Sequence, residues 1–283
     1  MDAKVSSSPF LAACVQLCAG RDIAPNVDRA IGLIEEAATA GAQFIATPEN
    51  TSMMEAETPL LFEKTVAEED DKALAAIRRV AAERKVWTLI GSLPIKIAAD
   101  KLANRSFLIR PDGVIVARYD KIHMFDVDLG GGESYRESKN FRPGAQAVTA
   151  SLPWGVLGMT VCYDLRFPHL YRSLAEAGAS FLSVPAAFTR PTGSAHWHVL
   201  LRARAIENGA YVFAPAQDGV HENGRATYGH SLIVAPWGEV IAEAEGGLGF
   251  VMAEIDPAKV AEARSRVPSL QHDRAFALPE RKL

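Results

Sequence analysis

Residues 40–48 of the chain read AGAQFIATP, and residues 177–185 read AGASFLSVP. In each copy, a helical pattern stops at a glycine, which is a frequent residue just past the end of a helix. A short apolar strand then follows and ends at a proline. This repeated stretch predicts that the chain contains two similar halves, each of which alternates helices with buried strands.

Two further pairs of segments recur in the same order along the chain. Residues 79–90 and 204–214 each pass from a helix into an apolar strand, while 108–117 (LIRPDGVIVA) and 233–242 (IVAPWGEVIA) each form a hairpin about a turn. The strands are apolar almost throughout, as in sheets that are covered on both faces. We therefore expect an α/β fold in which two sheets face each other with helices outside both, a four-layer αββα sandwich.

We interpret residues 1–283 as a single domain, because no stretch rich in proline and serine separates the two halves. Two separate domains are the alternative, but α/β folds commonly reach this length undivided. One interval has no regular period. Residues 120–143 combine glycines with charges, and we expect a long loop there of the kind that is often functional.

Composition and charge exclude several classes of function. The net charge is −4 and the basic residues are scattered, so nothing indicates a nucleic acid or a membrane surface as partner. No apolar run is long enough to span a membrane, and the apolar residues 10–20 fit a secretory signal poorly. Cysteines 14, 18 and 162 have the spacing of neither a disulfide framework nor a zinc site, which favours a cytoplasmic location.

A candidate nucleophile lies in residues 159–168, MTVCYDLRFP. The apolar run 156–161 predicts a short buried strand that delivers Cys162 to a tight turn, although many free cysteines are only small buried side chains. Glu49 follows another short strand and Lys121 follows the first hairpin. Because ligands of α/β sheets bind at the carboxyl ends of the strands, we expect these three side chains to meet at one rim.

A thiol, an ammonium group and a carboxylate are sufficient for acyl transfer. Glu49 would remove the thiol proton as general base, and the Cys162 thiolate would attack a carbonyl carbon. Lys121 and the backbone N–H of Tyr163 would stabilise the oxyanion. Glu49 would then hand a proton to departing ammonia and later activate water against the thioester. The residues thus predict an amidase.

Three motifs, in this order, make the chain resemble the nitrilase superfamily of carbon–nitrogen hydrolases over nearly its whole length. They are residues 48–50 (PEN), 119–123 (YDKIH) and 161–168 (VCYDLRFP). The resemblance implies the αββα sandwich and a triad of glutamate, lysine and cysteine that needs no metal or other cofactor. It also implies that Glu137 is a second glutamate, which holds the lysine and the leaving group. Without this match, Glu137 would be taken for a solvated loop carboxylate.

Three further stretches of the chain are most similar to one branch of the superfamily. They are residues 193–210 (GSAHWHVLLRARAIENGA), 214–219 and 228–231. The Nit1-like branch hydrolyses deaminated glutathione, a metabolite-repair reaction, whereas the sister branch of ω-amidases cleaves α-ketoglutaramate. His198 departs from the glutamate that is usual in both branches. An N-carbamoyl amino acid hydrolase is a further alternative, and a non-catalytic interaction module on the same fold is the alternative outside enzymes.

Both branch substrates are anionic 2-oxo acid amides, so a cation should line the pocket. Arg166 is the preferred candidate, and an ion pair at a helix start is its structural alternative. Arg190 is a weaker candidate. We expect Tyr163, Ala187 and Phe188 to shape the pocket walls, although Ala187 and Phe188 could equally belong to the core.

The histidines indicate packing and hydrogen bonding rather than a metal site. His196 and His198 lie two apart on a predicted helix and therefore point to different sides. No acidic residue lies at a spacing that would complete a ligand set. His230 begins an apolar strand and is expected to be structural.

The resemblance also implies a homodimer or a larger homo-oligomer. The C-terminal tail, residues 262–283, carries the apolar residues Phe276 and Leu278. We expect this tail to lie at an interface between copies.

Overall fold

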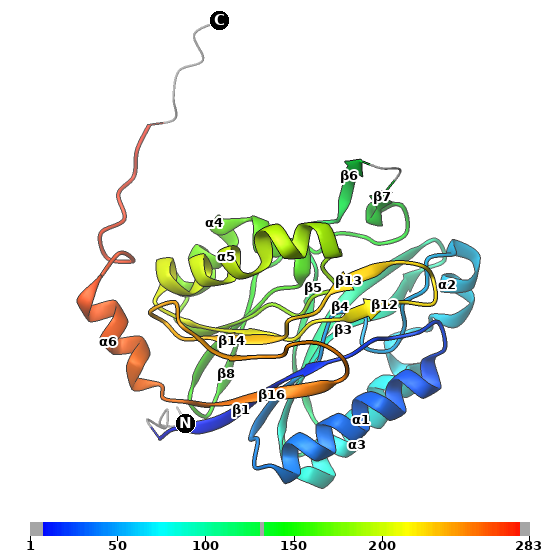
Figure 1. The fold of residues 1–283 in the computed structure, drawn as a ribbon, viewed down its shortest axis with the longest axis horizontal. Coiled ribbons are helices and arrows are strands. Elements are labelled where there is room, and N and C mark those ends of the chain that lie inside the picture. Colours follow the sequence, from blue (N-terminus) through cyan, green and yellow to red (C-terminus); the bar gives the residue numbers. More distant parts are fainter. Residues whose placement is uncertain (1–7, 131–132, 278–283) are drawn as a thin grey trace, which may run out of the picture.

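Two six-stranded sheets form the centre of the molecule in the computed structural model, which describes residues 8–130 and 133–277 (Figure 1). From edge to edge, the first sheet consists of β16 (Gly249–Ile255), β1 (Phe10–Gln16), β2 (Phe44–Ala46), β3 (Trp87–Ala98), β4 (Lys101–Ile109) and β5 (Ile115–Asp120). The second consists of β15 (Val240–Glu243), β14 (Leu232–Val234), β11 (Tyr211–Ala214), β10 (Ala179–Ser183), β9 (Gly155–Met159) and β8 (Val148–Leu152).

The two sheets have matching topologies, which confirms the repeat. In the first, β1, β2 and β3 are parallel and the hairpin β4–β5 continues the sheet antiparallel. In the second, β9, β10 and β11 are parallel and β14–β15 continues it in the same way. The repeated glycines, Gly41 and Gly178, have φ values of 100° and 96°, and each donates a hydrogen bond to the end of the preceding helix. Only glycine adopts this backbone readily, so both helices stop at the same point of the repeat.

The sheets pack face to face through buried aromatic rings. Phe44 of β2 lies 5.1 Å from Phe213 of β11 between ring centroids, and Phe10 of β1 lies 5.6 Å from Phe181 of β10. These rings belong to one continuous core that draws residues from both halves. Side chains alternate across a strand, so the neighbours of Phe10 and Phe44 face the other way, towards the helices.

Helices cover the outer face of each sheet and complete the four predicted layers (Figure 1). On the first sheet lie α1 (Ile23–Thr39) and α3 (Lys72–Arg84), with Ile34 and Ile77 fully buried against it. On the second lie α4 (Pro168–Glu176) and α5 (Arg190–Asn208), which bury Leu174 and Leu201. The fold class is therefore the αββα sandwich expected from the sequence.

The interval 120–143 is not the structureless loop that we expected. It contains the hairpin β6 (Asp126–Gly130) and β7 (Glu133–Arg136), followed by a short 3-10 helix, η2 (Glu137–Lys139). Residues of these strands are exposed or half-buried in alternation. Residues 126–129 do alternate between polar and apolar, but the run is only four residues long and is set among glycines and charges, so it does not predict a strand there.

The remaining elements lie around the two sheets. They are α2 (Thr58–Lys64), the 3-10 helices η1 (Glu68–Asp70) and η3 (Cys162–Arg166), the hairpin β12 (Asp218–Val220) and β13 (Ala226–Tyr228), and α6 (Ala258–Arg266). After α6 the chain runs away from the body of the molecule (Figure 1). Phe276 in this segment is 83% exposed, while Leu278 lies outside the described residues.

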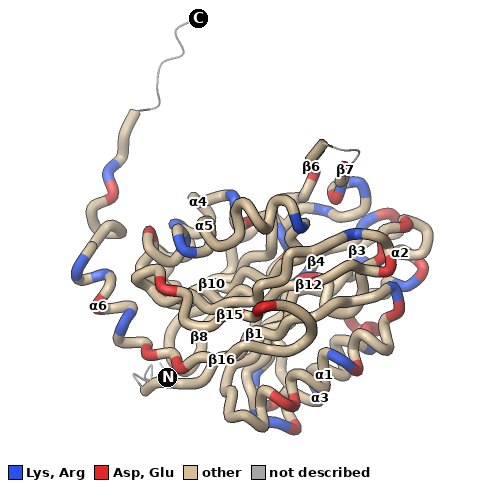
Figure 2. Tube along the Cα trace, viewed as in Figure 1, with Lys and Arg blue, Asp and Glu red and all other residues tan. Residues whose placement is uncertain are grey.

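Charges of both signs are interspersed on the outer elements. Figure 2 shows Lys and Arg next to Asp and Glu along α1, α3 and α6. Among the described residues, none of the helices combines the length and the apolar character needed to cross a bilayer.

Candidate active site

The predicted nucleophile lies on a strained turn directly after β9. Cys162 is the first residue of η3 and has a φ of 51°, in the left-handed region that residues other than glycine rarely adopt. Its backbone N–H donates to the carbonyl of Pro185, which follows β10 in the repeat, at 2.9 Å. Such conformations persist only where surrounding contacts enforce them, and they concentrate at functional sites.

Asp164 supplies contacts that hold this turn. No role is predicted for it from the sequence. Its fully buried carboxylate accepts hydrogen bonds from the N–H of Val161 at 2.9 Å, the N–H of His123 at 3.0 Å and the hydroxyl of Tyr119 at 2.7 Å. Tyr119 and His123 stand on either side of Lys121. One carboxylate therefore ties the turn that carries the cysteine to the strand end that carries the lysine.

Glu49 is held where β2 ends by an unusually close approach of β3. A Cβ atom added to Gly91 of β3 would lie 2.1 Å from the carbonyl oxygen of Thr47, so only glycine fits there. From the second half of the chain, the N–H of Ala187 donates to the Glu49 carboxylate at 3.0 Å, and the Gln217 amide donates to the Glu49 backbone carbonyl at 2.9 Å. Both sheets thus fix this carboxylate.

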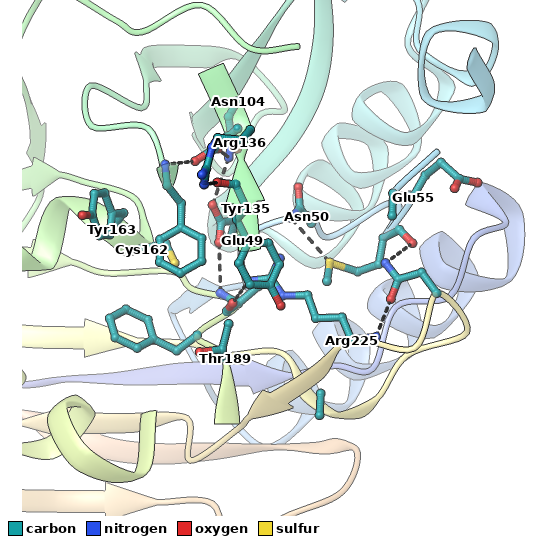
Figure 3. Close-up of a pocket in the computed structure, with 18 of the residues that line it drawn as sticks. Glu49, Asn50, Glu55, Asn104, Tyr135, Arg136, Cys162, Tyr163, Thr189 and Arg225 are labelled. Carbon is teal, nitrogen blue, oxygen red and sulfur yellow. Dashed lines mark hydrogen bonds between the residues drawn. The ribbon is translucent and has the colours of Figure 1, made fainter. Parts of the chain in front are cut away.

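The four predicted catalytic side chains line one cavity, and Figure 3 shows Glu49 and Cys162 among them. The ammonium of Lys121 lies 2.9 Å from an oxygen of Glu49 and 2.8 Å from an oxygen of Glu137. The amide of Asn104 on β4 donates to both carboxylates, at 2.9 Å and 3.0 Å. Cys162 lines the same cavity as these groups, and its thiol and the Glu49 carboxylate shift each other's pKa.

The electrostatics keep the lysine and Glu49 charged and the cysteine neutral. Burial raises the pKa of the Cys162 thiol well above its usual range, and the charge of Glu49 raises it further against the opposing effect of Lys121. Burial also opposes ionisation of Glu49, but the Lys121 ammonium outweighs it and lowers the Glu49 pKa. For Lys121, burial is outweighed by Glu137 and Glu49, which hold its pKa well above the usual value. The resting site therefore pairs a thiol with an ionised base.

The catalytic groups lie in a cavity of about 900 Å³. Of the residues predicted to bind substrate, Tyr163, Ala187 and Phe188 line it. Arg166 does not, contrary to our expectation. Its guanidinium lies behind the wall, 5.9 Å from the ring centroid of Tyr163 and 5.3 Å from that of Phe188.

The position of Arg166 follows from the tight turn of η3, which points it away from the thiol four residues earlier. There its guanidinium contacts His196 of α5 at 3.2 Å. The structure instead brings Arg225, from the loop between β12 and β13, to the cavity. Nothing in the local sequence distinguishes Arg225 or Asn104 from structural polar residues, because only the tertiary fold places them at the site. Gln217 lies in the matched stretch 214–219, but that match gave it no role.

The histidines form hydrogen bonds, as expected, but our expectation that no acidic residue could complete a ligand set with them is wrong, because the fold brings Glu243 to His198 and His230. Nε2 of His198 on α5 lies 2.8 Å from Oε1 of Glu243, and Nδ1 of His230 lies 2.7 Å from the same oxygen. In the described part of the chain, these three side chains form the one group close enough together to share a metal ion, and none of them lines the cavity.

Comparison with known proteins identifies the family of the chain. The model of one family, described as carbon-nitrogen hydrolase, matches residues 11–265. The chain belongs to this family. As a carbon–nitrogen hydrolase, it is an enzyme that cleaves carbon–nitrogen bonds other than peptide bonds.

Individual relatives of this carbon–nitrogen hydrolase cover almost the whole chain. It is 42% identical to a deaminated glutathione amidase of Synechocystis sp. PCC 6803, over 93% of this chain and 98% of the relative. It is 37% identical to the human omega-amidase NIT2, over 94% and 95%. The crystal structure of the C. elegans NitFhit protein superimposes with a TM-score of 0.88 at 35% identity, covering 94% of this chain and 65% of the longer one.

Proposed function

We propose that this hydrolase is an amidase that cleaves the amide bond of a small 2-oxo acid amide, deaminated glutathione, through a thioester on Cys162. The observation that supports the proposal is the position of the Lys121 ammonium, 2.9 Å from Glu49 and 2.8 Å from Glu137, beside the Cys162 thiol in the cavity. Base, electrophile and nucleophile are then all within reach of one carbonyl group.

Acylation begins when Glu49 removes the thiol proton as the sulfur attacks the carbonyl carbon. A neutral thiol beside an ionised carboxylate suits this step, because the thiolate forms only when the substrate is in place. The carbonyl oxygen becomes an oxyanion, which Lys121 and the N–H of Tyr163 stabilise. Glu49 returns the proton to the amide nitrogen, the carbon–nitrogen bond breaks, and the amine leaves a thioester behind. Glu137 holds Lys121 in place throughout.

Deacylation uses the same groups, but Glu49 now takes the proton of water and returns it to the sulfur. Glu49 takes a proton from water, and the resulting hydroxide attacks the thioester carbon beside Lys121. When the carbon–sulfur bond breaks, the proton passes from Glu49 to the sulfur of Cys162. The 2-oxo diacid leaves, and the thiol and the carboxylate are restored.

Two features favour deaminated glutathione over the smaller α-ketoglutaramate as the substrate. The cavity of about 900 Å³ exceeds what a five-carbon amide fills and has room for a dipeptide leaving group. A relative at 42% identity also carries that name, whereas the human omega-amidase is 37% identical. The ω-amidase and N-carbamoyl amino acid hydrolase reactions use the same triad and are the alternatives.

The test is the release of 2-oxoglutarate from deaminated glutathione and from α-ketoglutaramate by purified protein. We expect Cys162→Ala to lower kcat by about 10³-fold or more, because Cys162 is the one cysteine among the described residues that line the cavity. Cys18→Ala is the matched control, since Cys18 is half-buried and does not line the cavity. Full turnover in the Cys162 variant would contradict the mechanism, and a higher kcat/KM for α-ketoglutaramate would reverse the substrate assignment.

A further inference from the structure

The half-buried guanidinium of Arg225 lies in the cavity without an acidic partner. Its Nη2 donates to the backbone carbonyl of Ala187, and its plane stacks on the ring of Tyr135, 5.0 Å from the ring centroid (Figure 3). Its Nε is buried and has no hydrogen-bond acceptor. In the described part of the chain, Arg225 forms no ion pair with a carboxylate at 4.0 Å or less. A half-buried cation that has an unused donor and no carboxylate within 4.0 Å is suited to bind an anion.

The other cations of the cavity are engaged or exposed. Lys121 is held by Glu49 and Glu137. Arg136 pairs with Asp128 on the surface of the β6–β7 hairpin. Arg190 lines the cavity but is exposed to solvent, where water and salt weaken its attraction for an anion. Among the described cations that line the cavity, Arg225 is therefore the one best placed to bind an anion.

Arg225 also contacts the residue that holds the base. The N–H of Ala187 donates to Glu49, and the carbonyl of the same residue accepts from Arg225, so a single residue separates the base from the guanidinium. In a five-carbon 2-oxo acyl group, the carboxylate lies about 5 Å from the carbonyl carbon that the thiol attacks, given ordinary bond lengths. Cys162 and Arg225 line the same cavity, and we infer that an acyl group of this length bridges them.

We propose that Arg225 binds the terminal carboxylate of the substrate and so selects acyl groups that end in an anion. This inference rests on the proposed amidase function and names the residue that determines its substrate class. A guanidinium can take a carboxylate through two parallel hydrogen bonds, which fixes its orientation as well as its charge. Because this contact is made equally in the ground state and in the transition state, it acts mainly on KM.

The experiment compares two amides that differ in one group. α-Ketoglutaramate carries the terminal carboxylate, whereas 4-oxopentanamide has a methyl group in its place and the same length. We expect Arg225→Gln to lower kcat/KM for α-ketoglutaramate by about 100-fold, mostly through KM, and to change the neutral amide less than about threefold. Arg225→Lys should recover part of the loss, since it keeps the charge but not the planar fork.

Arg264→Gln is the matched control. Arg264 is also half-buried and donates to backbone carbonyls, those of Asn208 and Ala179, but it lies outside the cavity lining. It should leave the ratio of the two substrates unchanged. If Arg225→Gln slows both amides by the same factor, Arg225 only supports Ala187 and the inference is wrong. If Arg190→Gln instead causes the selective loss, the carboxylate binds at the exposed rim and the inference is also wrong.

A second measurement does not depend on turnover. 2-Oxoglutarate should protect Cys162 of the wild-type protein from alkylation by iodoacetamide, as followed on the peptide that contains Cys162. The concentration needed for half-protection should rise about 100-fold in Arg225→Gln and stay constant in Arg264→Gln. Equal protection in both variants would overturn the role of Arg225. If the wild-type protein hydrolyses neither amide but is protected through Arg225, the proposed reaction fails while the anion site stands.

Discussion

At the scale of single residues, the chemistry depends on a lysine that stays charged inside the protein. Lys121 is 2% exposed and is held by two carboxylates, so its pKa lies well above the usual value although burial opposes the charge. Glu49 shows the reverse shift: the same ammonium outweighs burial and lowers its pKa. Neither group changes its charge near neutral pH. An ammonium fixed beside the base is thus a permanent feature of the site rather than one that pH switches on.

The pH profile of kcat/KM tests this interpretation. Glu49 acts as a base only when ionised, and its lowered pKa keeps it ionised down to values below its ordinary range near 4. Lys121 stays protonated at high pH because its pKa is raised. We therefore predict a flat profile between about pH 6 and 9. The stabilisation that comes from ionised Glu49 is likewise present above that ordinary value and is lost as the pH falls through the lowered pKa. An inflection of kcat/KM near pH 7 would contradict both shifts.

The sequence predicts the reacting residues but not the residues that position them. Glu49, Lys121 and Cys162 each follow a strand, and this local pattern can be recognised from the sequence alone. The side chains that hold them, such as Asp164 and Asn104, have no local signature. A buried carboxylate in a polar stretch looks like a solvated one until its donors, which are distant in sequence, are known.

At the scale of elements, the close approach of β3 to the end of β2 sets the position of the base. Gly91 allows it, since a Cβ atom there would meet the backbone of Thr47 and Pro48 at 2.1 to 2.4 Å. The neighbouring Ser92 then holds the backbone after Glu49: its hydroxyl accepts from the N–H of Asn50 at 2.9 Å. The base is thus fixed by a glycine that touches no substrate.

We predict that Gly91→Ala lowers activity at least tenfold and destabilises the fold by about 1–3 kcal/mol, because the clash is with backbone that cannot move without displacing Glu49. Gly32→Ala is the matched control. Gly32 lies within α1, and an added Cβ meets nothing within 4 Å, so the change should stabilise by about 0.5–1 kcal/mol and leave activity intact. Thermal unfolding and the amidase assay together check the pair. Wild-type activity in Gly91→Ala would show that the approach of the strands does not position the base.

At the scale of the whole molecule, the internal repeat carries most of the information about the fold. Gly41 and Gly178 each end a helix and precede a strand at equivalent positions in the two halves. The two sheets built from these halves have the same topology. The hairpin β6–β7 has no counterpart in that repeat. Its strand β7 lines the cavity, and the hairpin lies outside the two large sheets, so core packing does not determine its residues. This is why the framework could be predicted from the sequence while part of the pocket could not.

The C-terminal segment after α6 bears on assembly, which remains a prediction. Phe276 is 83% exposed and Val267 is 55% exposed, on a segment that leaves the body of the molecule (Figure 1). Covering a phenylalanine side chain contributes roughly 1.5–3 kcal/mol, so a partner copy is favoured to bind this segment.

We predict that the full chain is a dimer or larger by light scattering, and that removing residues 267–283 reduces its size. Phe276→Ser should weaken association without lowering kcat, since Phe276 is not among the residues that line the cavity. A monomeric full chain at micromolar concentration, or an unchanged size after the deletion, would exclude this segment from the interface.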